Sequence, residues 1–140
     1  MDDVVGLWTL ESRDNNFDQF MQCRGASWFL RNLMGRFIPD VEYTLSEDRK
    51  TLTKKTITSM KTMVYPMAVD EEFIPDKTLS GKAEYGRVTE TSGRKVLQEM
   101  RFQEDNEIAA LIERQVIDGK MIVTLRCKDI VCQEIYKKKE

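Results

Sequence analysis

The feature that most constrains the fold is a series of short alternating segments that runs from Pro39 toward the C-terminus. Apolar and polar side chains alternate in them, as Val41, Tyr43 and Leu45 do with their neighbours, and turn residues separate them at intervals of roughly ten residues. Such alternation is typical of β-strands with one face turned to a core. The expected strands are residues 6–13, 41–46, 51–58, two within 60–73, 79–88, 94–103, 107–116, 120–128 and 131–137.

Two turn residues and one ambiguity refine this strand pattern. Asp118-Gly119 is a strong signal for a two-residue hairpin, because both central residues need a positive φ. Pro66 has no N–H to donate, so it weakens the prediction of the strand that would contain it. In the last strand the inward face stays open, since the even residues of 132–136 fit a core as well as the odd residues of 131–135.

Two short helices are expected between the first two strands, over residues 17–24 and 27–37. Asn16 and Ser27 suit their N-caps, because each side-chain oxygen can accept an unpaired backbone N–H, and Gly25 breaks the chain between the helices. Ten strands with such an insert predict an all-β fold. The expected architecture is a ten-stranded antiparallel up-and-down β-barrel, or clam, with a two-helix lid between its first two strands.

Composition narrows the classes of function. The chain has 140 residues and a net charge of -2, so no general basic field is present to attract nucleic acid. It has no histidine, which removes His-based catalytic triads and the usual zinc ligand sets. Asp2 and Asp3 precede no apolar core, so no signal peptide is expected, and no apolar run approaches the roughly 20 residues that span a bilayer. A cytoplasmic protein without cofactor or metal is expected.

The three cysteines are an odd number without spaced pairs. Cys23, Cys127 and Cys132 are therefore expected to be reduced thiols in a cytosolic protein rather than a disulfide framework. Cys127 and Cys132 flank a tight hairpin and are expected to act as small buried apolar residues.

Several motifs carry a resemblance to a known family. They are Gly6-Leu7-Trp8, Asn16-Phe17-Asp18-Gln19-Phe20-Met21, Gly25, Arg31, Gly35, Pro39, Glu71-Glu72-Phe73 and Gly119-Lys120-Met121-Ile122-Val123. On these motifs the chain resembles the intracellular fatty-acid-binding proteins of the calycin superfamily over almost its whole length. The resemblance implies one barrel domain, residues 1–140, with a lid at about 17–37 and one lipid in an internal cavity.

The resemblance also implies where a ligand's head group would lie. Many family members hold a carboxylate with two arginines and a tyrosine; Arg114 falls at the first arginine and Tyr136 at the tyrosine, while Glu134 replaces the second arginine. An ionised Glu134 would pair with Arg114, whereas burial could keep it protonated as a donor. Either state makes the interior more neutral, and predicts tolerance of amide or alcohol head groups. A purely structural Arg114–Glu134 ion pair is the alternative.

The cavity and lid are expected to be lined by apolar side chains: Phe17, Phe20, Met21, Trp28, Leu33, Phe37, Met100 and Leu125. The helix residues among them could equally close the barrel top without touching ligand. Gln98 shares a strand face with Met100 and could line the cavity or join a polar network. A local basic excess comes from Arg24, Arg31 and Arg36. It is either a solvated helix face or a surface for transient contact with anionic membrane.

The predicted function is that of a monomeric carrier, not an enzyme, which solubilises and transports one long-chain fatty acid or related acyl lipid. Two alternatives stay open within lipid binding: a lipid-gated interaction protein that delivers ligand to a nuclear receptor or an enzyme, with nuclear localisation, and a retinoid-binding member. An enzyme that uses Glu134, Tyr136 and Arg114 as acid, base and anchor is disfavoured, because no nucleophile–base pair is evident.

Overall fold

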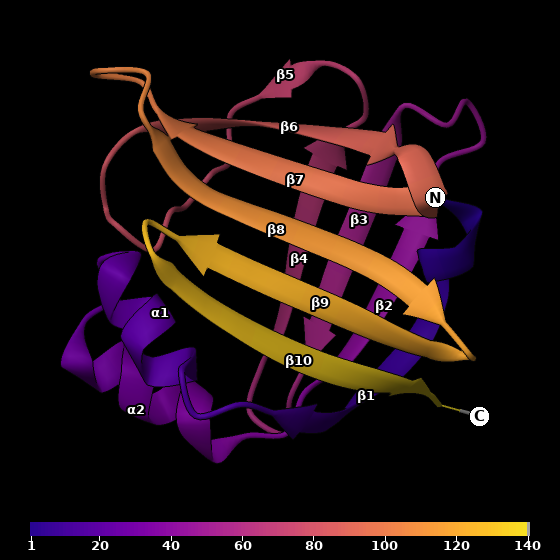
Figure 1. The fold of residues 1–140 in the computed structure, drawn as a ribbon, viewed down its shortest axis with the longest axis horizontal. Coiled ribbons are helices and arrows are strands. Elements are labelled where there is room, and N and C mark those ends of the chain that lie inside the picture. The colour runs from indigo at the N-terminus through magenta and orange to yellow at the C-terminus, as the bar shows by residue number, and fades with distance from the viewer. Residues whose placement is uncertain (140) are drawn as a thin grey trace.

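Ten strands form one antiparallel sheet that curls into a nearly closed barrel (Figure 1). The computed structural model describes residues 1–139. The strands are β1 (Gly6–Arg13), β2 (Asp40–Leu45), β3 (Thr51–Ile57), β4 (Thr62–Ala68), β5 (Glu72–Phe73), β6 (Glu84–Thr91), β7 (Lys95–Phe102), β8 (Ile108–Ile117), β9 (Lys120–Cys127) and β10 (Ile130–Lys138). Their order in the sheet is β4-β3-β2-β1-β10-β9-β8-β7-β6-β5. The predicted ten-stranded up-and-down barrel is confirmed.

The first and last strands join the two halves of the barrel. β10 lies between β1 and β9 and pairs with both, and beyond β10 the Lys139 N–H still donates to the Leu7 carbonyl at 2.9 Å. In Figure 1 the strands β6–β10 cross in front of β2–β4, so the two halves of the sheet face each other. The side chains between these two layers form the interior of the barrel.

The sheet ends at β4 and β5, and this is where the barrel is incompletely paired. A single parallel bridge joins Val69 to Val88 there, and the Asp70 N–H donates to the Val88 carbonyl at 2.8 Å. Inside, the rings of Tyr65 and Phe73 meet edge to face with centroids 6.2 Å apart. Pro66 lies on β4, an end strand, where its missing N–H costs no ladder hydrogen bond on the open side.

The lid consists of α1 (Phe17–Cys23) and α2 (Trp28–Arg36), which lie at one end of the barrel beside β9 and β10 (Figure 1). Ser27 caps α2 as predicted, because its Oγ accepts the Leu30 N–H at 3.2 Å. The predicted Asn16 cap is wrong: its Nδ2 instead donates to the Val131 carbonyl at 2.9 Å. Asn16 therefore fastens the start of the lid to β10. In residues 1–139, neither helix nor any other is long and apolar enough to cross a bilayer.

One predicted strand begins later than expected. Residues 79–83 were expected to open the strand 79–88, but β6 begins at Glu84. The preceding residues form a turn in which Thr78 Oγ1 donates to the Lys82 carbonyl at 2.8 Å and Ser80 Oγ accepts the Lys82 N–H. Gly81 takes a positive φ of 74° in this turn, which strand geometry does not allow. Hydrogen bonds from the Thr78 and Ser80 side chains to the nearby backbone thus take the place of strand pairing in residues 79–83.

The interior face of the last strand is settled by burial. Cys132, Glu134 and Tyr136 are buried, so the even-numbered residues of β10 face inward.

Trp8 is fully buried and its Nε1 donates to the Val4 carbonyl at 2.9 Å. The predicted Asp118-Gly119 hairpin is confirmed, because both residues have positive φ, 52° and 78°.

The close contact at Gly86 generates a test of how tightly the barrel is filled. A Cβ at this position would lie 2.6 Å from Met100 Sδ and 2.7 Å from Phe73 Cζ. Gly86→Ala is therefore expected to lower the free energy of unfolding by about 1–3 kcal/mol, measured by urea denaturation. Gly35→Ala is the control: nothing lies within 4 Å of its Cβ, and alanine favours the helix. Equal stability of the two variants would contradict this description of the interior.

Candidate ligand-binding site

Arg114 is the buried cation at the centre of the barrel. It lies on β8 and is only 2% exposed. Its Nε donates to the hydroxyl of Tyr43 on β2 at 2.7 Å, and its Nη1 donates to Oε1 of Gln98 on β7 at 3.0 Å. Both partners are neutral side chains. The guanidinium is thus held across the interior by hydrogen bonds, and no carboxylate among residues 1–139 is paired with it.

Glu134 does not pair with Arg114, so that prediction is wrong. Its carboxylate is bound by Arg13, whose Nε and Nη2 lie 2.7 and 2.6 Å from Oε2. The Tyr136 hydroxyl donates to Oε1 of the same carboxylate at 3.3 Å. Glu134 is therefore the ionic partner of Arg13 on β1. It competes with a ligand for Arg114 much less than it would if it were paired with Arg114.

A β-bulge in β1 is the reason that Arg13 reaches this acid. Leu10 pairs with Tyr136, but the next paired residue of β1 is Ser12, opposite Ile135, so that Arg13 comes opposite Glu134. One extra residue in a strand reverses which side chains face inward. Strict alternation from Trp8 and Leu10 would have turned Arg13 to the outer face, which is why the sequence pattern missed it.

Tyr136 completes this part of the interior and stays protonated. Burial first, then the Glu134 carboxylate and Tyr43, raise its pKa well above the ordinary value. The hydroxyl therefore remains a donor at any physiological pH. Its hydrogen bond is to Glu134, whereas Arg114 is bound by Tyr43, so the structure divides the predicted head-group residues between two adjoining networks.

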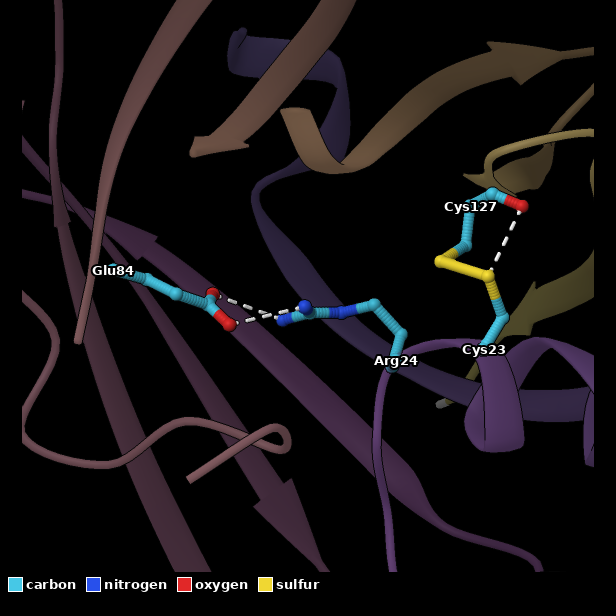
Figure 2. The surroundings of a disulfide bond; sticks show 4 residues. All are labelled: Cys23, Arg24, Glu84 and Cys127. Carbon is cyan, nitrogen blue, oxygen red and sulfur yellow. Dashed lines mark hydrogen bonds and ion pairs between the residues drawn. A yellow bond between two sulfur atoms is a disulfide. The ribbon is translucent and has the colours of Figure 1, made fainter. Parts of the chain in front are cut away.

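Arg24 forms a third polar cluster, at the mouth of the barrel (Figure 2). It follows α1 directly, is 7% exposed, and donates from both terminal nitrogens to the two oxygens of Glu84 at 3.1 Å. Ser80 Oγ donates to the same carboxylate at 2.8 Å. The prediction that Arg24 contacts solvent or membrane is wrong, because its guanidinium is buried and paired inside the molecule.

The other two cations of the predicted basic cluster differ from each other. Arg31 is 17% exposed, donates from Nε to Asp18 Oδ1 at 3.0 Å and from Nη1 to the Ala26 carbonyl at 3.2 Å. Arg36 is exposed at the end of α2. Only Arg36 of the three is thus turned to solvent.

The structure buries some of the residues that were predicted to line the cavity and exposes others. Phe20, Met21, Met100 and Leu125 are buried and Phe17 is half-buried. Trp28 is 68% exposed, so its assignment to the lining is wrong. The face of α2 that packs against the core carries Leu30 and Met34, one turn apart, whereas Leu33 and Phe37 are half-buried beside it. Because α2 is apolar on several sides, periodicity could not select its inner face.

Four large side chains in the barrel interior are almost completely shielded from solvent. Met21, Tyr43, Met67 and Met100 are each at most 2% exposed. One hollow of about 510 Å³ lies at the loop between β5 and β6, bounded by residues 74–78, residues 81–84 and Gln103, and another of about 220 Å³ lies beside the end of α1. Among residues 1–139, no group of three or more acidic, cysteine or histidine side chains is placed to hold a metal ion.

Comparison with known proteins shows which proteins this barrel is similar to. No protein-family model matches the chain. It is 29% identical, over 97% of its length, to sodium/calcium exchanger regulatory protein 1 of Doryteuthis pealeii, and covers 96% of that protein. It is 30% identical to fatty acid-binding protein type 3 of Fasciola hepatica, over 99% of both chains. The chain belongs to the fatty-acid-binding protein family.

A solved structure supports the same family. The fatty-acid-binding protein of Schistosoma mansoni, in complex with arachidonic acid, is 26% identical and superposes with a TM-score of 0.83, over 100% of this chain and 98% of that one. The present fatty-acid-binding protein therefore shares both the barrel and the helical lid with a protein whose structure contains a fatty acid.

The cysteines depart from expectation. Cys23 at the end of α1 and Cys127 at the end of β9 form a disulfide, with Cα atoms 6.1 Å apart (Figure 2). The prediction that all three thiols are reduced is therefore wrong. Cys132 is free and buried, as expected; burial first, then Asp14, raise the pKa of its thiol to about 12. The two bonded cysteines are 104 residues apart, so local spacing gave no signal for the pairing.

Tyr65, beside the open edge of the barrel, gives a pH test of this interior. Burial first, then the Glu84 carboxylate, raise its pKa to about 12. A tyrosine in the unfolded chain ionises near pH 10, so the stability from keeping Tyr65 protonated is complete below pH 10 and is lost as the pH rises to about 12. Between pH 10 and 12 the free energy of unfolding of the original protein is expected to fall by about 2–3 kcal/mol more than that of the Tyr65→Phe variant. Urea unfolding at each pH measures both. Parallel losses would show that Tyr65 ionises normally.

Proposed function

We propose that this fatty-acid-binding protein is a cytoplasmic, non-enzymatic carrier that holds one long-chain fatty acid, with the carboxylate at Arg114. The observation that carries the proposal is the buried Arg114, whose recorded partners, Tyr43 and Gln98, are both neutral. A carboxylate would bring the missing opposite charge, and charge-assisted hydrogen bonds to a forked guanidinium are the strongest available.

The sequence led us to expect that neutral head groups would be tolerated. The ion pair between Glu134 and Arg13 removes the reason for that expectation. That expectation required Glu134 to bind Arg114 or to donate a proton, but its charge is offset by Arg13. With its acid neutralised, the interior keeps the net positive charge of Arg114. A free fatty acid is therefore favoured over its amide or alcohol analogue.

The acyl chain would take the place of flexible side chains in the barrel. Met21, Met67 and Met100 are unbranched and rotate about three bonds, so they can move aside without a change in the strands. Burial of the chain supplies about 0.8 kcal/mol per CH₂. This gain offsets the cost of rearranging the interior and gives the protein a capacity to solubilise lipid.

Arg114→Gln is the direct test of the head-group assignment. Loss of one charged hydrogen-bonding group is expected to weaken oleate binding about 10- to 100-fold, measured by displacement of a fluorescent fatty acid. Binding of the neutral N-oleoylethanolamide should change little. Arg126→Gln, on the exposed outer face of β9, is the matched control and should leave both affinities unchanged. Equal losses for both ligands would contradict the proposal.

A second candidate activity, transient contact with membranes during ligand exchange, is favoured by the outer face of α2. Trp28 and Phe29 are 68% and 70% exposed, and Arg36 is exposed at the end of the same helix. Aromatic side chains with a flanking cation suit the interface of an anionic bilayer. The contact surface is thus proposed on α2, and no longer includes Arg24.

Trp28→Ala/Phe29→Ala tests this contact. The double variant is expected to bind vesicles that contain phosphatidylserine about tenfold more weakly than the original protein, measured by co-sedimentation. Because Trp8 is buried, the blue shift of tryptophan emission on adding vesicles should come from Trp28 and vanish in the variant. Ile117→Ala, also exposed but at the end of β8, is the control. Unchanged sedimentation of the double variant would place the contact elsewhere.

Two predictions from the sequence remain within this proposal. Delivery to a nuclear receptor or enzyme would appear in a pull-down as a partner whose binding changes when lipid is added. Retinoid binding would appear as a shift in retinoid absorbance on mixing. A monomer is the expected state throughout.

A further inference from the structure

The hollow beside the end of α1 is unusual because a disulfide forms part of its wall. Both Cys23 and Cys127 line this space of about 220 Å³, which opens between the lid and the barrel. Cys127 itself is 4% exposed and Cys23 is half-buried, so the hollow is the route by which a small molecule reaches the sulfur atoms.

The side chains that line the hollow carry a net positive charge. Its remaining lining consists of Arg24, Gly25, Ser80, Lys82, Phe102, Ile108, Ala109 and Lys128, which include cations but no carboxylate. The charge of Arg24 is offset by Glu84 behind it, whereas Lys82 and Lys128 are exposed. Exposed cations at the rim of the hollow attract anionic reagents to it.

We propose that this hollow is a thiol–disulfide exchange site for a small anionic thiol, and that opening the Cys23–Cys127 bond there loosens the lid. The reagent is defined by its chemistry: a thiolate that attacks sulfur, attached to carboxylates that Lys82 and Lys128 attract. The proposed cytoplasmic location supplies such thiols, and disulfides there are usually transient and regulatory.

The exchange consumes two thiols. The first thiolate attacks the more accessible Cys23 sulfur, breaks the bond to Cys127 and leaves the Cys127 thiolate with a mixed disulfide on Cys23. A second thiolate attacks the reagent's sulfur in the mixed disulfide and releases Cys23. The two protein thiolates take up the protons of the two thiols, and the products are one oxidised reagent disulfide and two protein thiols. Two electrons pass to the protein, and the reverse reaction closes the bond again.

The bond restrains the end of the lid that lies over the mouth of the barrel. It joins the last residue of α1 to the last residue of β9, and the adjacent Arg24 is joined to Glu84 on β6 (Figure 2). The lid is thus anchored on two sides, covalently and ionically. Reduction leaves the ion pair in place, so it loosens the helix without detaching it.

The third cysteine does not take part. Cys132 lies opposite Leu125 and is not opposite Cys127, and it is fully buried. The pKa of its thiol is raised to about 12, by burial first and then by Asp14, which keeps it protonated and a poor nucleophile. Exchange is therefore confined to Cys23 and Cys127.

The site is tested by the rate at which the disulfide opens. The oxidised protein is treated with reduced glutathione or with neutral 2-mercaptoethanol at equal thiolate concentration, and freed cysteines are alkylated and located by mass spectrometry. Cys23 and Cys127 should be freed together, and Lys82→Ser/Lys128→Ser should slow glutathione severalfold but not 2-mercaptoethanol. Lys55→Ser/Lys61→Ser, exposed lysines outside the hollow, should slow neither. Equal effects on both reagents, or none, would overturn the site.

The effect on the lid is measured without lipid, by hydrogen–deuterium exchange of residues 17–24. Exchange should be severalfold faster in the reduced protein and in Cys23→Ser/Cys127→Ser, while β7 stays unchanged. If the double variant does not fold, the reduced and oxidised protein give the same comparison. Identical exchange in both redox states would overturn the loosening.

The consequence for ligand exchange rests on the proposed carrier function. Oleate release should be severalfold faster from the reduced protein, and release that is independent of redox state would overturn this consequence. If oleate does not bind at all, the carrier proposal fails, while the alkylation and deuterium measurements still decide the exchange site.

Discussion

A charge inside a closed barrel must be partnered, and much of this structure follows from that constraint. An uncompensated buried ion costs several kcal/mol, and removing one partner of a buried pair is expected to cost about 3–5 kcal/mol. Among residues 1–139, no buried side-chain nitrogen or oxygen lacks a hydrogen-bond partner. Arg13 with Glu134 and Arg24 with Glu84 satisfy the constraint as ion pairs. Arg114 satisfies it with neutral groups alone, and the proposed carboxylate site rests on that difference.

These clusters also tie together elements that are distant in the chain. Arg13 links β1 to β10, Arg24 links the lid to β6, and Arg114 links β7 and β8 to β2 across the interior. The polar interior therefore does two things at once. It holds the two halves of the barrel and the lid in place, and it sets the electrostatic potential inside the barrel.

The sequence predicted what depends on local pattern. Alternation located most of the strands, the turn residues Asp118-Gly119 marked a hairpin, and Ser27 marked the start of α2. What it missed depends on contacts between distant residues. The bulge that turns Arg13 inward has no signal within β1, because it is defined only by the register with β10.

In the lid, too, the features that the sequence did not predict depend on contacts between distant residues. A helical stripe that ends in Arg24 looks amphipathic with a solvated cation, and only the position of Glu84 sixty residues later reveals that the cation is buried. Similarly, nothing in the spacing of Cys23 and Cys127 indicates that the end of α1 meets the end of β9. A helix as apolar as α2 offered several candidate inner faces, and packing chose Leu30 and Met34.

The position of β10 between β1 and β9 has a consequence for how the protein is made. A ribosome delivers β1 long before β10, so the edge of β1 that pairs with β10 stays uncovered while the strands between them are made. The seam of the barrel can form only after the final strand has left the exit tunnel, and it then joins the most widely separated parts of the chain. Closure of this seam should accordingly proceed at the rate of long-range strand pairing.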